Sequence, residues 1–501
     1  MSYQKGDIIM RNRPWAYVLE DKHKSAYCHF CFRRPIEKAD QKLRRCTQCL
    51  FAHYCDGKCA KSAWKDHKVE CNRLSLALKS GADIPECNIR LLARILMKLA
   101  RGERSDPPDA CIPPSERTYD SLCTHADQVE LLSQIKIPSE SSNAHPNPLP
   151  VLSASIESSV LQITAFTYII EKLVAFLGKE NMPTDKNVLK NAYSKLIVNA
   201  MTLYDGAWPY GIGAALPLGA TRFDHACKPN ADYMIRDGCQ IVVTALEDIA
   251  SIEDVRICYC NSMEMTPQRR ATLKEHYYFE CQCAFCLDEN RDNMMRSLWC
   301  PEKGCGGAIP CTAKFIPLPC TKCRMEMTGK DTYVRGAVSL LSEINEKVAA
   351  YTALFENAES SPELVEQQKA SNQEITQLYH KIKSTIHPLN VFYIKLAVHL
   401  ADHDSPLGWK LYLEETEAYR YYHGFSAFLG IRLVLQGGFQ LASQLLDEAA
   451  KSLEEAETIL RVTHGKDHPV YKDMLNVKDV QIPQMKHLQH MTNKLPKMPK
   501  S

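Results

Sequence analysis

Pairs of cysteine and histidine dominate the first 71 residues, and their spacing predicts metal binding. The pairs are Cys28-x₂-Cys31, Cys46-x₂-Cys49, Cys55-x₃-Cys59 and His67-x₃-Cys71. Each pair supplies half of a tetrahedral Zn²⁺ site, so eight ligands are enough for two ions. Alternating pairs would give one ion bound by Cys28, Cys31, Cys55 and Cys59, and another bound by Cys46, Cys49, His67 and Cys71. His29 and His53 lie nearby as alternative ligands.

Two further cysteine groups follow in the middle of the chain. Cys281-x-Cys283-x₂-Cys286 supplies three thiolates and needs a fourth ligand from a distant segment. Cys300-x₄-Cys305 and Cys320-x₂-Cys323, with glycines that allow tight turns between them, are typical of a zinc ribbon. All of these sites are saturated, so we expect four structural Zn²⁺ ions and no zinc hydrolysis. We expect buried or free thiols at Cys87, Cys111, Cys123, Cys239, Cys258, Cys260 and Cys311.

Composition agrees with a metal-binding protein of a reducing compartment. With no signal peptide or membrane span expected, the 22 cysteines are better interpreted as thiolates than as disulfides, which favours the nucleus and cytoplasm. The formal net charge is only +2, so the overall charge does not indicate a nucleic-acid or membrane partner. The 501 residues, 45% of them hydrophobic, predict two to four globular units.

The elements around these ligands change character along the chain. Short strands are predicted before residue 28, and apolar residues at helical spacing predict a helix from 89 to 99. Further helices are expected near 153–177 and 185–203, and short strands at 240–245 and 255–259. After residue 330 successive helices suggest an array of tetratricopeptide type, followed by a frayed tail from Pro483.

Several motifs resemble those of one enzyme family. The pattern from 28 to 71 resembles the MYND finger, and Asp224-His225-Ala226-Cys227-Lys228-Pro229-Asn230 resembles the Asn-His-Ser-Cys-x-Pro-Asn motif of SET-domain lysine methyltransferases. Ile257-Cys258-Tyr259 and then Phe279-Glu280-Cys281 follow in the same order, and 461–465 resembles a C-terminal segment of the family. The chain is therefore similar, over nearly its whole length, to the SET and MYND domain (SMYD) family of protein-lysine methyltransferases.

The resemblance implies an α+β multidomain fold. It has a SET-type irregular β core with an inserted MYND finger and helical insert, post-SET zinc sites, and an all-α tetratricopeptide-like C-terminal array. The implied boundaries are 1–27 for the first part of the SET domain, 28–71 for the finger, 72–204 for the helical insert, 205–262 for the SET core, 276–290 for the post-SET segment, 298–326 for the ribbon, 330–480 for the array and 483–501 for the tail.

The resemblance also implies roles for single residues. Cys227 becomes the fourth ligand of the post-SET zinc, and S-adenosylmethionine is expected to bind at Tyr119, Asp127, Asn199, Asp224, His225, Tyr259 and Phe279. Tyr259 matches the family's active-site tyrosine, and Tyr277 matches a second tyrosine of the lysine channel. The substrates would be lysines of histones or other proteins.

Departures from the family pattern keep other functions open. No Gly-x-Gly segment precedes Cys28, Asp224 stands where the family has Asn, Ala226 replaces Ser, and 251–254 replaces a Gly-Glu-Glu turn. These differences favour an alternative, a catalytically weak or inactive adaptor whose finger binds proline-rich peptides. DNA is a third possible partner, because the finger holds ten Lys/Arg against five Asp/Glu, Arg44 and Arg45 among them.

Overall fold

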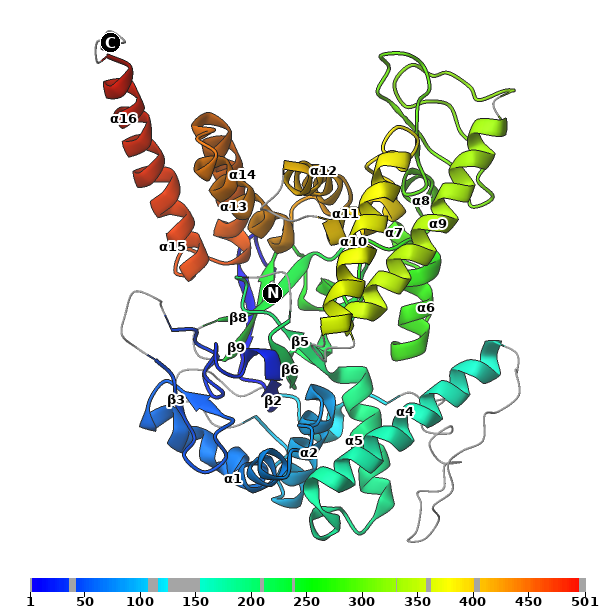
Figure 1. Ribbon diagram of the computed structural model, residues 1–501. Helices are drawn as coiled ribbons and strands as arrows, with labels where there is room; N and C mark the ends of the chain where they lie inside the picture. Colours follow the sequence, from blue (N-terminus) through cyan, green and yellow to red (C-terminus); the bar gives the residue numbers. More distant parts are fainter. Residues whose placement is uncertain are drawn as a thin grey trace. The chain divides into compact units, whose positions relative to one another are not determined.

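The computed structural model describes residues 2–35, 42–106, 116–124, 154–207, 211–236, 239–329, 331–356, 362–400 and 406–494 (Figure 1). The chain divides into two compact units. The first unit comprises Met1–His225, Pro229–Ile257 and Ala271–Glu280, and the second comprises Ala226–Lys228, Cys258–Arg270 and Cys281–Ser501.

Small sheets form the β part of the first unit. One has the order β1-β9-β8, built from β1 (Ile8–Asn12), β9 (Gln240–Ala245) and β8 (Ala231–Arg236), and a second has the order β2-β6-β5, built from β2 (Ala16–Leu19), β6 (Gly213–Leu216) and β5 (Met201–Leu203). Both are antiparallel. A short parallel pair joins β10 (Arg256–Ile257) to β7 (Asp224–His225), and a hairpin joins β3 (Arg44–Arg45) to β4 (His53–Tyr54).

Helices cover one of these sheets and share its core. They are α1 (Gly57–Ser80), α2 (Cys87–Ala100), α4 (Ala154–Leu177) and α5 (Lys186–Asn199). α2 packs against β2, β6, α4 and α5, and its residues from Ile89 to Lys98 are all buried. One apolar cluster joins the finger region to the sheet and the helices. It contains Trp15, directly before β2, Phe51 and Leu74 from the finger region, and Phe166 from α4. Zinc is therefore not the only source of the finger's stability, because the finger shares a hydrophobic core with the helical insert.

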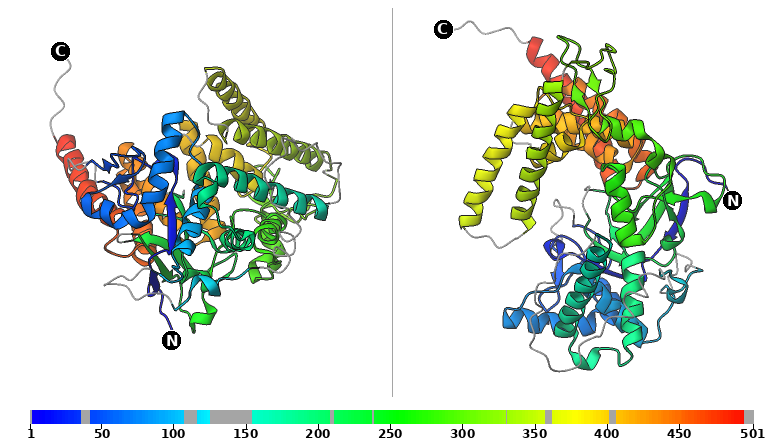
Figure 2. Two further views of the ribbon diagram at one scale, coloured as in Figure 1. Left: turned by 90° about the horizontal axis from the view of Figure 1, so that it is seen from below. Right: turned by 90° about the vertical axis from the view of Figure 1, so that its right-hand side faces the viewer.

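The second unit is mainly helical. Two short helices, α7 (Ala284–Leu287) and α8 (Glu289–Met294), precede a hairpin of β11 (Leu298–Trp299) and β12 (Ala308–Ile309). The array follows as α9 (Asp331–Glu356), α10 (Pro362–Ile382), α11 (Val391–Leu400), α12 (Pro406–His423), α13 (Ala427–Ala442), α14 (Leu446–Thr463), α15 (Pro469–Asn476) and α16 (Ile482–Lys494). Neighbours along the chain pack against each other, as Figure 2 shows for α9 and α10. α6 (Thr266–Tyr277) contributes residues to both units.

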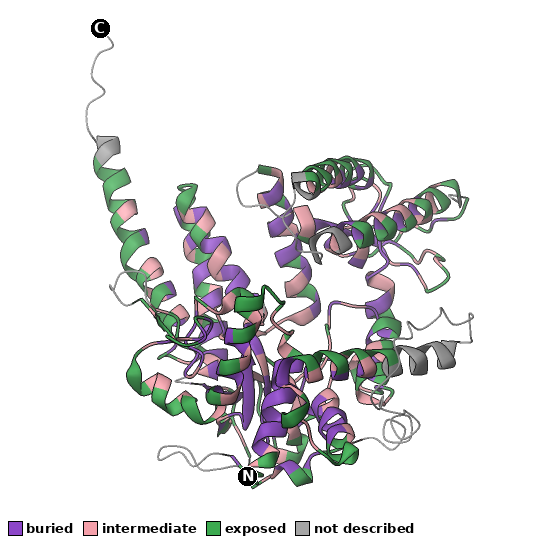
Figure 3. Ribbon diagram, turned by 60° about the horizontal axis from the view of Figure 1, so that its bottom comes forward, coloured by how far each residue is buried: buried purple, intermediate pink, exposed green. Residues whose placement is uncertain are grey.

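The α+β fold class expected from the sequence is confirmed, with two corrections to its elements. The helix predicted for 185–203 ends at Asn199, and Met201–Leu203 forms the edge strand β5 instead. The predicted frayed tail is wrong as far as Lys494, since Ile482–Lys494 is α16, largely exposed beyond Ile482 (Figure 3). Ser, Asn and Pro residues predict a loop at 138–150, which lies outside the described residues. Within those residues, no helix is both long and apolar enough to cross a membrane.

Candidate functional site

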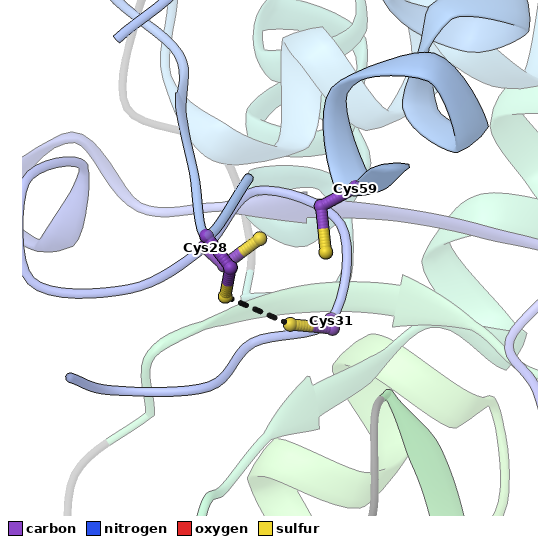
Figure 4. A group of neighbouring side chains, drawn as sticks. Cys28, Cys31 and Cys59 are labelled. Atoms are coloured by element: carbon purple, nitrogen blue, oxygen red, sulfur yellow. Dashed lines mark hydrogen bonds between the residues drawn. The ribbon is translucent and has the colours of Figure 1, made fainter. Parts of the chain in front are cut away.

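The first centre of the finger brings together Cys28, Cys31, Cys55 and Cys59, whose ligand atoms all lie within 4.8 Å of one another. The Asp56 carboxylate caps α1 by accepting from the Cys59 amide at 2.9 Å, which fixes the last ligand in the first helical turn. Figure 4 shows the sulfur atoms of Cys28, Cys31 and Cys59 turned toward a common point. The Sγ atoms of Cys31 and Cys55 are 3.5 Å apart. Four sulfurs held tetrahedrally at the usual Zn–S distance would be about 3.8 Å apart, so this group fits zinc.

The second centre brings together Cys46, Cys49, His67 and Cys71. The Cys46 and Cys71 sulfurs are 3.6 Å apart, as are the Cys49 sulfur and the Nε2 atom of His67. Burial lowers the pKa of His67 to about 4, so its ring is neutral at physiological pH, which is the form that binds a metal.

His29 and His53, the alternative ligands, belong to neither centre. The Nε2 atom of His29 lies 3.2 Å from the Lys24 carbonyl oxygen, and the Nδ1 atom of His53 lies 2.9 Å from that of Phe51. The structure thus groups the eight finger ligands in the alternating arrangement that their spacing favours.

The third centre lies in the second unit and joins Cys227 to Cys281, Cys283 and Cys286. The Cys227 sulfur is 3.4 Å from that of Cys286 and 4.0 Å from that of Cys281. The distant fourth thiolate that the Cys-x-Cys-x₂-Cys segment requires is therefore supplied by the residue that the resemblance implied.

The fourth centre is the ribbon, with Cys300, Cys305, Cys320 and Cys323. Its sulfurs are 3.6 Å apart for Cys300 and Cys323, and 3.7 Å apart for Cys305 and Cys320. A Cβ atom added at Gly307 would lie 2.6 Å from the Cys320 sulfur, so only glycine allows the chain to pass this close to the centre.

The donor chemistry of all four centres fits structural zinc. Each offers four soft or borderline ligands and leaves no open position for a catalytic water. Among the described cysteines none forms a disulfide. Burial raises the pKa of the Cys239 and Cys311 thiols to about 12, as expected of inert buried thiols outside the four centres, while Cys111 lies outside the described residues.

Two residues expected at a cofactor lie close together in the first unit. Lys195 in α5 donates from Nζ to the Tyr119 carbonyl at 2.8 Å, and its ammonium lies 4.4 Å from the centre of the Tyr119 ring. Asn199, one helical turn later, donates from its amide nitrogen to the carbonyls of Lys195 and Cys123, both at 2.9 Å. Lys195 therefore ties the Tyr119 segment to the end of α5. Asp127 lies outside the described residues.

Asp224, His225 and Phe279 belong to the same unit. Asp224 and His225 form β7, and the His225 and Phe279 rings are 6.0 Å apart. The side chain of Asn230 brackets the partner strand β10, since its Nδ2 donates to the Asp254 carbonyl at 2.9 Å and its Oδ1 accepts from the Arg256 amide at 2.7 Å. This bracket holds Arg256 and Ile257 in parallel register with Asp224 and His225.

The two tyrosines of the expected lysine channel belong to different units. Tyr259 follows β10 by two residues and is counted with the second unit, whereas Tyr277 ends α6 in the first. Their pairing in one lysine channel stays a prediction.

Sequence reasoning missed a buried ion network that attaches the finger to α2. Glu70, one residue before the ligand Cys71, accepts from the guanidinium of Arg94 at 2.7 Å and lies 3.7 Å from that of Arg90. The Arg94 guanidinium also donates to the Tyr17 carbonyl of β2. The signal was present in the sequence, because Arg90, Arg94 and Lys98 recur every four residues in an otherwise apolar helix.

Comparison with known proteins agrees with these motifs. The family model of the MYND finger matches residues 28–71. The chain is similar to the mouse histone-lysine N-methyltransferase Smyd1, with 25% identity over 93% of this chain and 83% of the relative. It is also similar to the human histone-lysine N-methyltransferase SMYD3, with 24% identity over 94% and 91% of the two chains, and to the human N-lysine methyltransferase SMYD2, with 22% identity over 94% and 92%. Residues 28–71 therefore form a MYND finger, and over more than nine-tenths of its length the chain is similar to the SMYD proteins, as its sequence motifs indicate.

Proposed function

We propose that this protein is an S-adenosylmethionine-dependent protein-lysine N-methyltransferase. The observation that carries the proposal is the bracket made by Asn230, which holds the strand leading to Tyr259 in register with Asp224 and His225. Relatives that align over most of the chain are named as histone-lysine or N-lysine methyltransferases, which supports the same reaction class.

The residues of the first unit fit the cofactor. The amide nitrogen of Asn199 is engaged by two carbonyls, so its oxygen is directed as an acceptor, which suits the amino groups of an adenosyl or amino-acid moiety. The Phe279 ring beside His225 offers an aromatic surface. S-adenosylmethionine would supply an electrophilic methyl group, and Asn199, Asp224, His225 and Phe279 would hold it.

Tyr259 and Tyr277 would act on the lysine rather than on the cofactor alone. Methyl transfer is a direct displacement, so the enzyme needs no nucleophilic residue of its own. Aromatic walls align a neutral lysine amine and exclude water from it, which favours the uncharged amine that attacks the methyl group. The zinc ions would stabilise the fold and take no part in the reaction, because each centre already has four protein ligands.

The substrates and partners are lysine-containing proteins, histones or others, met in the nucleus or cytoplasm. The finger exposes Leu50 and Trp64, at 52% and 47%, which suits recognition of a proline-rich peptide against an aromatic surface. Arg44 and Arg45 are also exposed, and duplex DNA remains the weaker candidate for that face.

A second candidate function is favoured by Asp224 alone. This exposed carboxylate stands where the family has an amide, and an anion near the cofactor's carboxylate would weaken its binding. A protein so disabled would serve as an adaptor through its finger and helical array.

The test is transfer of labelled methyl groups from S-adenosylmethionine to proteins of a cell extract by zinc-replete protein. We expect labelled protein bands with wild type and their loss in Tyr259→Phe, while Tyr421→Phe, a change at an exposed tyrosine, keeps them. Absence of label with wild type, or equal label with Tyr259→Phe, would overturn the proposal.

A further inference from the structure

Arg269 links the post-SET thiolates to the chain that follows Tyr259. Its side chain is fully buried. Its Nε donates to the Cys227 sulfur at 3.3 Å and its Nη2 to the Cys286 sulfur at 3.4 Å. The same guanidinium donates to the Thr266 hydroxyl at 2.8 Å and to the Glu264 carbonyl. One planar fork of five N–H donors thus contacts two metal ligands and two points of the segment 258–266.

Arg291, in α8, contacts the same segment. It is 5% exposed and donates to the carbonyls of Ser262 and, at 3.3 Å, Glu264. The guanidinium lies 4.2 Å from the centre of the Phe285 ring and 5.3 Å from that of Tyr422. Stacking between aromatic faces fixes the plane of the guanidinium, so its two terminal nitrogens have little freedom to turn away from those carbonyls.

Asp292 and His423 also contact this segment. Its carboxylate accepts from the Thr266 amide at 2.9 Å and from the Thr266 hydroxyl at 3.1 Å. The imidazole of His423 lies 3.2 Å from the Ser262 hydroxyl oxygen. Backbone atoms at 262, 264 and 266 are therefore all engaged by buried or half-buried side chains of the second unit.

These contacts concern a segment with no regular structure of its own. Between Ile257, where β10 ends, and Thr266, where α6 begins, no helix or strand is present among the described residues. Segments of this kind are normally mobile, because their backbone groups are not paired in a helix or sheet. Here side chains supply the pairing instead, and they do so next to the residue that would face the substrate lysine.

Charge explains why arginine stands at these places. Four thiolates around one Zn²⁺ leave the centre with a net negative charge, which is costly to bury without nearby cations. Arg269 touches two of those sulfurs. A lysine carries the same charge, but its three donors share one nitrogen, so it cannot reach two sulfurs, a hydroxyl and a carbonyl that lie around a whole guanidinium.

We propose that Arg269 and Arg291 are positioning residues that transmit the geometry of the post-SET zinc centre to the Tyr259 segment, residues 258–266. The proposal rests on the proposed methyl transfer for its functional half. The structural part of the proposal is that the two arginines hold the segment in place, and it depends only on the contacts described above.

The experiment compares Arg269→Lys, Arg291→Lys and Thr266→Val with wild type. Thr266→Val removes the hydroxyl that bonds both Arg269 and Asp292. Every arginine and zinc ligand stays in place, so this variant tests the contacts to the segment even if an arginine variant folds poorly. Arg432→Lys is the matched control, because Arg432 is a buried arginine whose hydrogen bonds go to Tyr412, Glu415 and Thr416 of α12 and not to the segment.

The first readout is hydrogen exchange of peptides covering 258–266, measured by mass spectrometry at equal zinc content. We expect faster exchange there in all three variants, with peptides of the ribbon at 298–326 unchanged, and no change at 258–266 in the Arg432→Lys control. Unchanged exchange at 258–266 in the three variants would overturn the proposal.

The second readout is the kinetics of methyl transfer. A displaced tyrosine should lower kcat by about tenfold or more while KM for S-adenosylmethionine changes by less than about threefold, since misalignment affects the transition state more than cofactor binding. A parallel loss in Arg432→Lys would show mere destabilisation and contradict the positioning role. Should wild type transfer no methyl group, the proposed function fails, and the exchange measurement still decides whether the arginines hold the segment.

Discussion

Asn230 is the single side chain on which the register of the β7 and β10 pair depends most. It bonds both the carbonyl of Asp254 and the amide of Arg256. We predict that Asn230→Ala costs about 1–3 kcal/mol of local stability, because two hydrogen bonds, each contributing about 0.5–1.5 kcal/mol, are lost.

The measurement is hydrogen exchange of a peptide covering 250–258, where Asn230→Ala should exchange about tenfold faster or more. Asn290→Ala, at an exposed asparagine of α8, is the control and should leave that peptide unchanged. Equal exchange in Asn230→Ala and wild type would mean that the strand pair holds without the bracket.

At the same scale, the metal ligands show what sequence can predict and where it stops. The finger and ribbon ligands lie in pairs a few residues apart, so local spacing is enough to group them. Cys227 lies 54 residues before Cys281, and only the family resemblance pointed to it. Arg269 and Arg291 carry no motif at all, since their partners are backbone carbonyls and sulfurs that only the folded chain brings within reach.

At the scale of elements, the finger and α2 are held together by buried charges as well as apolar contacts. Glu70, 3% exposed, is the carboxylate facing Arg90 and Arg94. We predict that Glu70→Gln lowers the free energy of unfolding by about 3–5 kcal/mol, because the buried guanidinium of Arg94 is left without its anion, while Arg90 keeps the Asp21 carboxylate at 2.9 Å.

Denaturant unfolding of the zinc-loaded protein measures this loss. Glu180→Gln is the matched control, since the Glu180 carboxylate pairs with Arg73 but its side chain is 66% exposed, and such a surface pair contributes less than about 1 kcal/mol. A loss of similar size in both variants would contradict the buried network.

Some predicted helices and strands end at other residues than in the structure, and the reasons can be identified. β9 was predicted at its observed bounds, because a short run rich in β-branched residues between turns favours a buried strand. The sequence after Asn199 continues the apolar pattern of α5, but its residues pair with β6, a partner that lies beyond local sequence. Pro483 suggested a stop, yet it stands at the second residue of α16, directly after the π-helical turn Val477–Gln481. A π-helical turn changes the hydrogen-bond pattern locally, which lets the helix continue past a residue without an N–H.

At the scale of the whole molecule, the zinc centres divide evenly, two in each compact unit. We predict about four zinc ions per chain, falling to about three in Cys46→Ser in the first unit or Cys320→Ser in the second, because each centre loses one of four ligands. Elemental analysis of purified protein measures the ratio.

Cys311→Ser is the control for this count. Its thiol is buried near the ribbon but lies outside all four centres, so the variant should keep about four ions. Retention of the full zinc content by Cys320→Ser would show that the ribbon does not hold a metal.

The central claim is that the chain binds S-adenosylmethionine and transfers its methyl group, and calorimetric titration of S-adenosylmethionine into zinc-replete protein tests it most directly. The account predicts binding with a Kd of about micromolar order in wild type, and tighter binding in Asp224→Asn, where an anion is removed from the cofactor's surroundings. No measurable binding in wild type, with binding restored only in Asp224→Asn, would contradict the account and leave an adaptor built on a disabled SET scaffold.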